Sequence, residues 1–157
     1  MTRANYSQAI SALVTHFGDD LLCVVLFGSQ ARGEAHMDSD HDLLVVIDNL
    51  PLEPIARMKR MVAALEECDL RINPVAATCS EFTRDVTPLI LDICYDGVCL
   101  YGQDFFEPMR GKVRTGLQSA GLHRHTIENS FFWQFEKEPT GPWEFSWTGF
   151  HEFTKRT

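Results

Sequence analysis

Apolar positions along the chain follow two different patterns, and each pattern predicts one kind of element. Residues 21–27 and, directly after Asp42, residues 43–47 are short, continuous apolar runs rich in β-branched side chains, which is typical of strands buried on both faces. Elsewhere apolar residues recur three and four positions apart, which predicts amphipathic helices that cover a sheet. The order of the two patterns predicts an α/β (α+β) protein with a mixed β-sheet flanked by helices.

The ends of the predicted elements carry local signals. Asn5 and Gln8 have the spacing of a capping box for a first helix that ends near Gly18. A second helix follows Pro54 and ends near Cys68. The other predicted elements, in chain order, are a strand at 70–78, a turn after Ser80 and Glu81, a helix at 89–95, a strand at 98–101, and a helix with Met109, Val113 and Leu117 that stops near Gly121.

The C-terminal stretch is rich in large aromatic side chains. Segments 126–135 and 143–150 read as two strands joined by a turn at 139–142, which predicts a hairpin. Its shared faces carry Phe131, Trp133, Phe135, Trp143, Phe145 and Trp147. These rings either pack the hairpin onto the rest of the protein or form a homodimer surface or a base-stacking platform, because they would otherwise leave an exposed patch. We therefore expect a domain at 1–104 and an extension at 105–157, made of a helix and an aromatic hairpin.

The candidate chemistry lies where the two apolar runs end and begin. Gly28 has no Cβ, so an anion can approach the backbone, and Ser29 adds a hydroxyl and, at the start of a short helix, N–H groups that point at a phosphate. Asp40 and Asp42 are two residues apart and share one face of the strand, where both can reach one metal ion. Oxygen ligands beside a triphosphate indicate Mg²⁺. The pattern predicts a nucleotide-phosphate and metal site.

Each of these features also has a simpler interpretation. A Gly-Ser pair after a strand is usually only a turn, and an Asp-x-Asp motif alone is commonly a solvated loop. Their spacing between two predicted strands favours the site. Arg32 either pairs with Glu34 or Asp38 or faces a phosphate. His36 and His41 lack the spacing of zinc ligands, and we expect both to be solvated loop residues.

Residues 27–35 and 39–43 together resemble the signature of the DNA polymerase β-like nucleotidyltransferase superfamily, in particular its minimal, single-domain branch. The likeness includes the Ala-Arg-Gly step at 31–33, the serine before the first aspartate, and the spacing between the two motifs. Segment 88–102 is similar to the helix, turn and strand that close the minimal domain, and 121–145 resembles a C-terminal extension of some members. The resemblance implies transfer of a nucleoside monophosphate, such as AMP from ATP, to a hydroxyl of a protein or small molecule.

The resemblance also assigns roles to individual residues. It implies that the turn after the first strand orients the β and γ phosphates and that the two aspartates hold Mg²⁺. The implied nucleotide-binding residues are Gly28, Ser29, Arg32 and Ser39, and the implied catalytic and metal-binding residues are Asp40 and Asp42.

One position departs from the family pattern. Related proteins carry a third carboxylate on the strand after the second helix, and Asn73 stands there in this chain. An amide carries no negative charge and is not a base. Asp69 and Glu81, on either side of this strand, are the candidate substitutes. We therefore expect catalysis that is slow, that depends on a single metal, or that takes the missing acid from a partner.

Composition limits the partners of the chain. It has 157 residues, of which 45% are hydrophobic, and a formal net charge of −8. A protein that grips long nucleic acid normally carries a basic face, so a template-copying polymerase is disfavoured. The basic groups on the predicted helices are expected to be solvated: Arg57, Lys59, Arg60, Arg110, Lys112 and Arg114.

Cysteine usage and the lengths of the apolar runs indicate the compartment. The five cysteines are irregularly spaced, without a Cys-x-x-Cys motif, which favours reduced thiols. No apolar stretch approaches the roughly twenty residues that a membrane span needs. Both observations favour a cytoplasmic protein.

Two classes of function remain open. The first is an adenylyltransferase, for which the resemblance implies pairing with a small helical HEPN protein as antitoxin and toxin. The second is a catalytically weak nucleotide-binding or partner-neutralising module. Asn73 favours the second, whereas intact Asp40 and Asp42 favour the first. An aminoglycoside-type nucleotidyltransferase would need an additional substrate domain.

Overall fold

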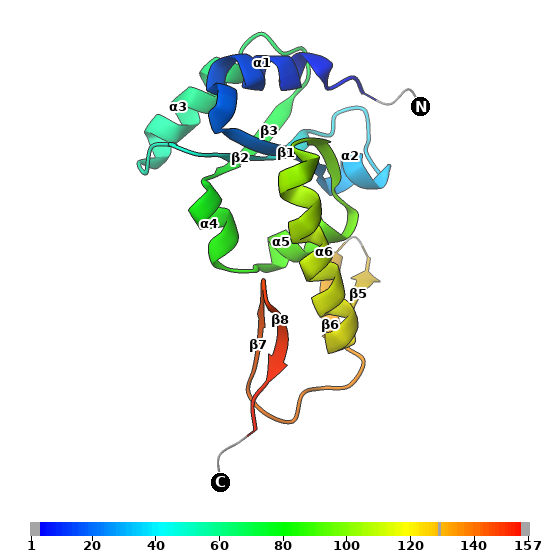
Figure 1. Ribbon diagram of the computed structural model, residues 1–157. Helices are drawn as coiled ribbons and strands as arrows, with labels where there is room; N and C mark the ends of the chain where they lie inside the picture. The colour runs from blue at the N-terminus through cyan, green and yellow to red at the C-terminus, as the bar shows by residue number, and fades with distance from the viewer. Residues whose placement is uncertain (1–3, 129, 155–157) are drawn as a thin grey trace.

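A four-stranded mixed β-sheet forms the centre of the protein, which a computed structural model describes at residues 4–128 and 130–154 (Figure 1). The strands, in sheet order, are β3 (Ile72–Ala77), β2 (His41–Ile47), β1 (Leu21–Phe27) and β4 (Val98–Tyr101). β1 is antiparallel to β2 and to β4, and β2 is parallel to β3. The two continuous apolar runs are thus the two inner strands, which confirms the predicted mixed sheet.

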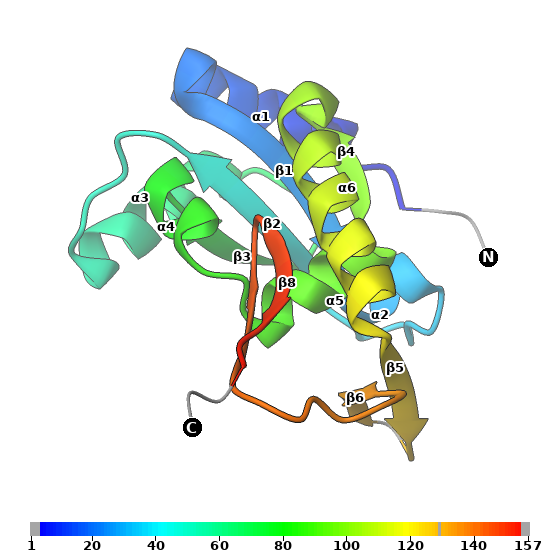
Figure 2. The same ribbon diagram turned by 60° about the horizontal axis from the view of Figure 1, so that its bottom comes forward.

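Helices cover both faces of the sheet (Figures 1 and 2). α1 (Ser7–Phe17) and α3 (Pro54–Leu65) pack on one face, where Val24, Leu26, Leu43 and Val45 belong to the same buried cluster as Leu13 and Met61. The other face packs against α4 (Cys79–Arg84), α5 (Pro88–Asp96) and α6 (Gln103–Ala120). The remaining short helices are η1 (Gly18–Asp20) and α2 (Gly28–Arg32).

The C-terminal stretch forms two hairpins instead of the single predicted one. β5 (Leu122–Ile127) pairs with β6 (Ser130–Phe135), and β7 (Trp143–Ser146) pairs with β8 (Gly149–Glu152). The proline-containing turn at 139–142 lies between the hairpins. The prediction failed because the polar β5 sequence lacks an apolar alternation that would mark it as a strand.

Four aromatic side chains of these hairpins pack against the core. Trp133, Phe135, Phe145 and Trp147 contact the buried cluster on the α5–α6 side of the sheet. The Phe145 ring lies so close to Gly116 of α6 that a Cβ there would come within 2.8 Å of it. For these rings the structure supports packing onto the domain.

Two local predictions were wrong. A turn was expected after Ser80 and Glu81, but Thr78 and Glu81 form a capping box that opens α4, a helix too short to show a helical period. Asn5 does accept a hydrogen bond from the Ser7 N–H, at 3.0 Å. Gln8 instead reaches the backbone of Glu67 and Asp69, so the expected capping box is absent.

Two arginines expected to be solvated lie inside the fold. Arg110 is 9% exposed, donates to the Gly97 carbonyl at 2.9 Å, and lies 3.4 Å from Glu107. Arg57 forms a two-pronged ion pair with Glu81, with N–O distances of 2.8 and 3.0 Å. A helical period locates such arginines on a helix, but the Gly97 carbonyl and the Glu81 carboxylate that they bind come from other parts of the chain.

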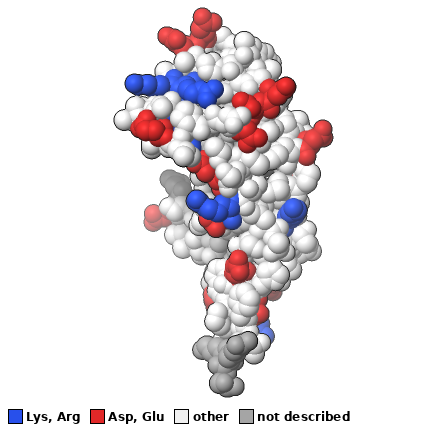
Figure 3. All heavy atoms as spheres, turned by 60° about the vertical axis from the view of Figure 1, so that its left-hand side comes forward, with Lys and Arg blue, Asp and Glu red and all other residues white. Residues whose placement is uncertain are grey.

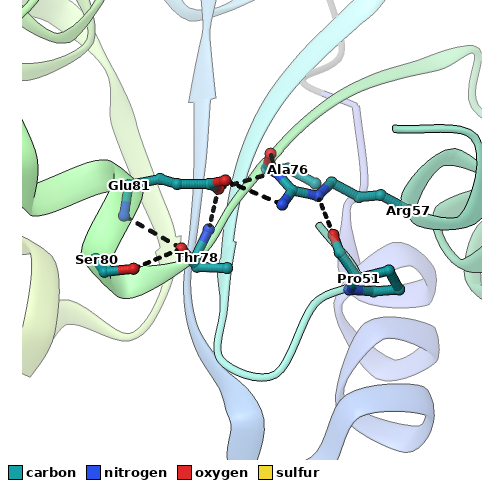
Figure 4. Close-up of polar contacts among 6 residues, drawn as sticks. All are labelled: Pro51, Arg57, Ala76, Thr78, Ser80 and Glu81. Carbon is teal, nitrogen blue, oxygen red and sulfur yellow. Dashed lines mark hydrogen bonds and ion pairs between the residues drawn. The ribbon is translucent and has the colours of Figure 1, made fainter. Parts of the chain in front are cut away.

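The Arg57–Glu81 pair joins three elements (Figure 4). Arg57 on α3 also donates to the carbonyls of Pro51 and Ala76, the latter on β3. Glu81 on α4 accepts the backbone N–H of Thr78. These hydrogen bonds, above all those from Arg57, lower the pKa of Glu81 to about 2.

Burial also affects the cysteines. All five thiols are free, and burial raises the pKa of Cys23 and of Cys94 to about 12. Neither thiol is therefore ionised near neutral pH.

In the part of the chain that the structure describes, no helix combines the length and apolar character that crossing a membrane requires.

Replacing Glu81 with Gln should lower the melting temperature at pH 7 by roughly 1–3 °C, because Arg57 loses a charged partner at a partly exposed site. The folded pKa of about 2 lies below the reference value of 4.5. The carboxylate therefore stabilises the fold above about pH 4.5, and this contribution is lost as the pH falls towards 2. The difference in melting temperature between wild type and E81Q should therefore become smaller as the pH of the thermal melts is lowered from 7 to about 3.

Glu138→Gln is a suitable control, because Glu138 is exposed between the two hairpins. If the difference in melting temperature between wild type and E81Q stays constant across the pH series, the stabilising role given to the Arg57–Glu81 pair is wrong.

Candidate functional site

The turn after β1 lies directly against the start of β2. Phe27, the last residue of β1, is opposite Asp42 in the antiparallel register. Gly28 follows with φ of +72°, and a Cβ at this position would collide with the Asp42 carboxylate. Glycine is the residue that permits both this backbone conformation and this close approach.

The two aspartates of the β2 motif have different partners. Asp40 lies before β2, and one of its carboxylate oxygens is 2.8 Å from Nη2 of Arg71. Asp42 accepts a hydrogen bond of 2.8 Å from the Asn73 side-chain amide. Asn73 is the direct neighbour of Asp42 in the parallel β2–β3 register. The position expected for a third carboxylate therefore does lie beside the aspartates, but its side chain is an amide that donates a hydrogen bond.

Arg71 is a residue that sequence reasoning missed. It precedes β3 by one residue and, like Asn73, lies on the strand face that Asp40 and Asp42 share. The signal was the period of two, since residues 71 and 73 repeat the spacing of 40 and 42. This signal could be used only with the knowledge that β3 is parallel to β2 and that Asn73 lies beside Asp42.

A loop folds back on α2 and completes this side of the site. The Ser39 hydroxyl accepts from the His36 N–H at 2.9 Å, and the Gln30 side chain donates to the Ser39 carbonyl at 3.3 Å. The Glu34 N–H donates to the Ser29 carbonyl at 3.0 Å. Gly28 and Ser29 thus lie at the start of α2, Ser39 and Asp40 in the loop that follows α2, and Asp42 on β2.

Arg32 at the end of α2 pairs with Glu34, one of the two partners expected from the sequence. Its Nε lies 2.7 Å from the Glu34 carboxylate. Its guanidinium carbon also lies 4.5 Å from the centre of the Phe131 ring on β6. No local pattern connects residues 32 and 131, so this contact could not be predicted.

The two candidate substitutes for a third carboxylate do not join the site. Glu81 follows the C-terminal end of β3, whereas Asn73 lies at its N-terminal end, and Glu81 is already bound to Arg57. Asp69 donates its backbone N–H to the side chain of Gln8 on α1, at 3.4 Å. Across residues 4–128 and 130–154, no three His, Cys, Asp or Glu side chains are grouped so that they could hold a metal ion.

The Asp40 and Asp42 pair still fits Mg²⁺. This ion is commonly bound through one or two carboxylates, with phosphates of the substrate and water as further ligands. The close packing of Gly28 on Asp42 keeps the predicted phosphate-binding turn beside these carboxylates. The donor set is therefore suited to a metal that arrives with a triphosphate.

His41 was expected in a solvated loop, and that expectation was wrong. It is the first residue of β2, and its Nδ1 lies 2.8 Å from the Tyr6 hydroxyl. Alternation along β2 places it on the opposite face from Asp42. His36 is exposed in the loop, as expected.

Comparisons of the sequence identify relatives for most of this region. Residues 8–106 match the family model described as polymerase beta, nucleotidyltransferase. A protein of Methanocaldococcus jannaschii, named as a candidate protein adenylyltransferase, is 36% identical over an alignment of 95 positions that covers 57% of this chain and 65% of that protein. The match thus spans slightly less than two thirds of the relative's length.

Solved structures share the fold. A crystal structure of a toxin–antitoxin with AMP-PNP aligns with a TM-score of 0.54 and 23% identity, over 75% of this chain and 90% of the matched one. A mutant of the MntA–HpeT toxin–antitoxin aligns with a TM-score of 0.54 and 22% identity over the same shares. Since the family model spans well over half of the sequence, including both motifs of the site, the chain belongs to the polymerase β nucleotidyltransferase family of enzymes.

Proposed function

We propose that this protein is a Mg²⁺-dependent nucleotidyltransferase that moves AMP from ATP to a hydroxyl of a protein or small-molecule acceptor. The observation that carries the proposal is the packing of Gly28 against Asp42. It brings an anion-binding turn and a pair of carboxylates to the same point. The name of the M. jannaschii relative and the AMP-PNP in the matched toxin–antitoxin structure support adenylyl transfer.

In this proposal the residues of the site bind and orient the triphosphate. Gly28 and Ser29 offer backbone N–H groups and a hydroxyl to the β and γ phosphates, and Arg32 and Ser39 complete the nucleotide-binding set. Asp40 and Asp42 hold the metal and are themselves oriented by Arg71 and Asn73. When bound, Mg²⁺ would neutralise charge on the transferred group.

The acceptor hydroxyl must lose a proton as its oxygen bonds to the α phosphorus and pyrophosphate leaves. Asn73 cannot take this proton, because an amide is not a base. We therefore propose slow transfer, or transfer assisted by a carboxylate of the acceptor or of a partner protein. The same reasoning supports the second candidate function, a nucleotide-binding module with little turnover.

The proposed partner is a small helical HEPN-type toxin, with this chain as its antitoxin. The two matched structures described above are toxin–antitoxin proteins, which supports the pairing. Long nucleic acid fits less well. On the face that Figure 3 shows, Lys and Arg groups are scattered among Asp and Glu and form no continuous basic surface, and the net charge is −8.

Two further features belong to the same proposal. The catalytic domain is residues 1–104, with 105–157 as an extension packed on it. The cytoplasm, where cells keep ATP, is the compartment in which the reaction would run.

The first test is transfer of label from α-phosphate-labelled ATP with Mg²⁺, using purified protein in a cell lysate. Wild type should label a macromolecule or metabolite, and the double variant Asp40→Asn, Asp42→Asn should not, because amides do not replace both metal-binding charges. Equal labelling by both proteins would refute the assigned site. Equal absence of label despite ATP binding by wild type would favour the nucleotide-binding module.

Changing Asn73 to Asp tests the third position. Without metal, the new carboxylate would face Asp42 across a contact that is now a 2.8 Å hydrogen bond, so N73D should melt at a lower temperature than wild type. With Mg²⁺ the extra charge should raise metal affinity and the rate of label transfer. Unchanged metal affinity and unchanged turnover would show that this position is not the third ligand site.

Gly28 and Gly33 form a matched pair, since both have φ of +72° but only a Cβ at Gly28 meets Asp42. Gly33→Ala should cost about 1–2 kcal/mol from the left-handed backbone alone and keep Mg²⁺ and ATP binding. Gly28→Ala should cost more and should lose Mg²⁺-dependent ATP binding, because the Asp42 carboxylate must move. Chemical denaturation and calorimetric titration measure the two effects. Equal behaviour of the two variants would argue against the Gly28–Asp42 contact as the basis of the site.

A further inference from the structure

Four side chains from separate parts of the chain form one continuous stack beside the candidate site. The guanidinium carbon of Arg124 on β5 lies 4.2 Å from the centre of the Tyr95 ring on α5 and 4.5 Å from that of Phe131 on β6. The guanidinium of Arg32 on α2 lies 4.5 Å from the same Phe131 ring. Two arginines therefore share one phenylalanine, and the stack connects α5 to α2.

The Arg124 end of the stack is firmly held. Its side chain is only 9% exposed, and it lies 2.6 Å from the Asp96 carboxylate and 3.4 Å from that of Asp92. The Trp133 indole N–H donates to the same Asp92 oxygen at 3.1 Å. Two carboxylates and two rings around one arginine fix the β5–β6 hairpin, and with it Phe131, against α5.

The hairpin sequence explains why Phe131 faces inward. Phe131, Trp133 and Phe135 alternate with exposed residues along β6, and Arg124 is opposite Trp133 in the β5–β6 register. The neighbouring Phe132 is on the outer face, 37% exposed and stacked on His125. The alternation of a strand therefore separates a ring that reaches Arg32 from one that does not.

The Arg32 end is restrained but still has donors to offer. Its Nε is bound to Glu34, and its side chain is 20% exposed. Among the residues that the structure describes, neither Nη1 nor Nη2 of Arg32 donates a hydrogen bond to a protein acceptor. α2 begins at Gly28, against Asp42, so these donors lie on the short helix that opens the proposed phosphate site.

We propose that the β5–β6 hairpin belongs to the nucleotide site, and that Phe131 is a positioning residue that holds Arg32 ready for the triphosphate. The proposal rests on the proposed function. An unrestrained arginine loses side-chain conformational entropy when it binds a phosphate. The contacts with Phe131 and Glu34 already restrict Arg32 before binding, so they reduce the entropy that binding costs. The hairpin lies outside the part of the chain that matches the family model, so this control of the site is a property of the extension.

The test compares Phe131→Leu, which removes the ring, with Phe131→Tyr, which keeps it. Phe132→Leu is the matched control on the outer face of the same strand. Titration calorimetry with ATP and Mg²⁺ should show binding weakened about three- to tenfold in F131L. F131Y and F132L should stay within about twofold of wild type. Wild-type affinity in F131L would overturn the positioning role.

A double-mutant cycle separates positioning from general stability. If Phe131 acts through Arg32, F131L should have no further effect on ATP affinity in an Arg32→Ala background. If F131L weakens binding equally in both backgrounds, its role is only structural and the proposal is wrong. A wild type that does not bind ATP would overturn the proposed function together with this inference, whereas ATP binding with F131L unchanged would overturn the inference alone.

The Nε–H resonance of Arg32 gives a readout that needs no nucleotide. The nearby Phe131 ring should shift this signal in the NMR spectrum of wild type and F131Y, and the shift should vanish in F131L. An Arg32 signal that is the same in wild type and F131L would show that the contact does not exist in solution, and would overturn the proposal whatever the ATP affinities.

Discussion

The contact between the Gly28 backbone and the Asp42 carboxylate is the constraint on which the rest of the site depends. It exists because β1 and β2 are antiparallel neighbours with Phe27 opposite Asp42. Both strands are buried by helices on their two faces, so their register cannot slip without exposing the core. The hydrophobic core therefore sets the distance between the turn and the carboxylates.

Charge around the aspartates is balanced by the edge strand. β3 runs parallel to β2 and brings Arg71 to Asp40 and Asn73 to Asp42. The amide of Asn73 stands where the resemblance implied a third carboxylate, and the Arg71 cation lies two residues before it. The protein itself thereby stabilises two neighbouring carboxylates. In exchange, position 73 provides no base that could take the proton of the acceptor hydroxyl. This is the physical ground for keeping a weakly catalytic module as the second candidate.

Several arginines of this acidic protein are used within the fold. Arg57 joins α3 to β3 and α4, Arg110 binds the turn before β4, and Arg124 holds a hairpin against α5. Each is paired with a carboxylate or carbonyl from a different element. Their positive charge therefore stabilises tertiary contacts and adds little to a basic surface.

The sequence by itself determined the inner strands, most helices and the residues proposed for the site, because apolar periods of 2 and 3.6 and a glycine turn are encoded by neighbouring residues. It missed α4, which is too short to show a period, and it joined two hairpins into one. Pairs such as Tyr6–His41, Arg57–Glu81 and Arg32–Phe131 were decided only by the tertiary structure. Their members are far apart along the chain, and only the packing of the whole core brings them within reach of each other.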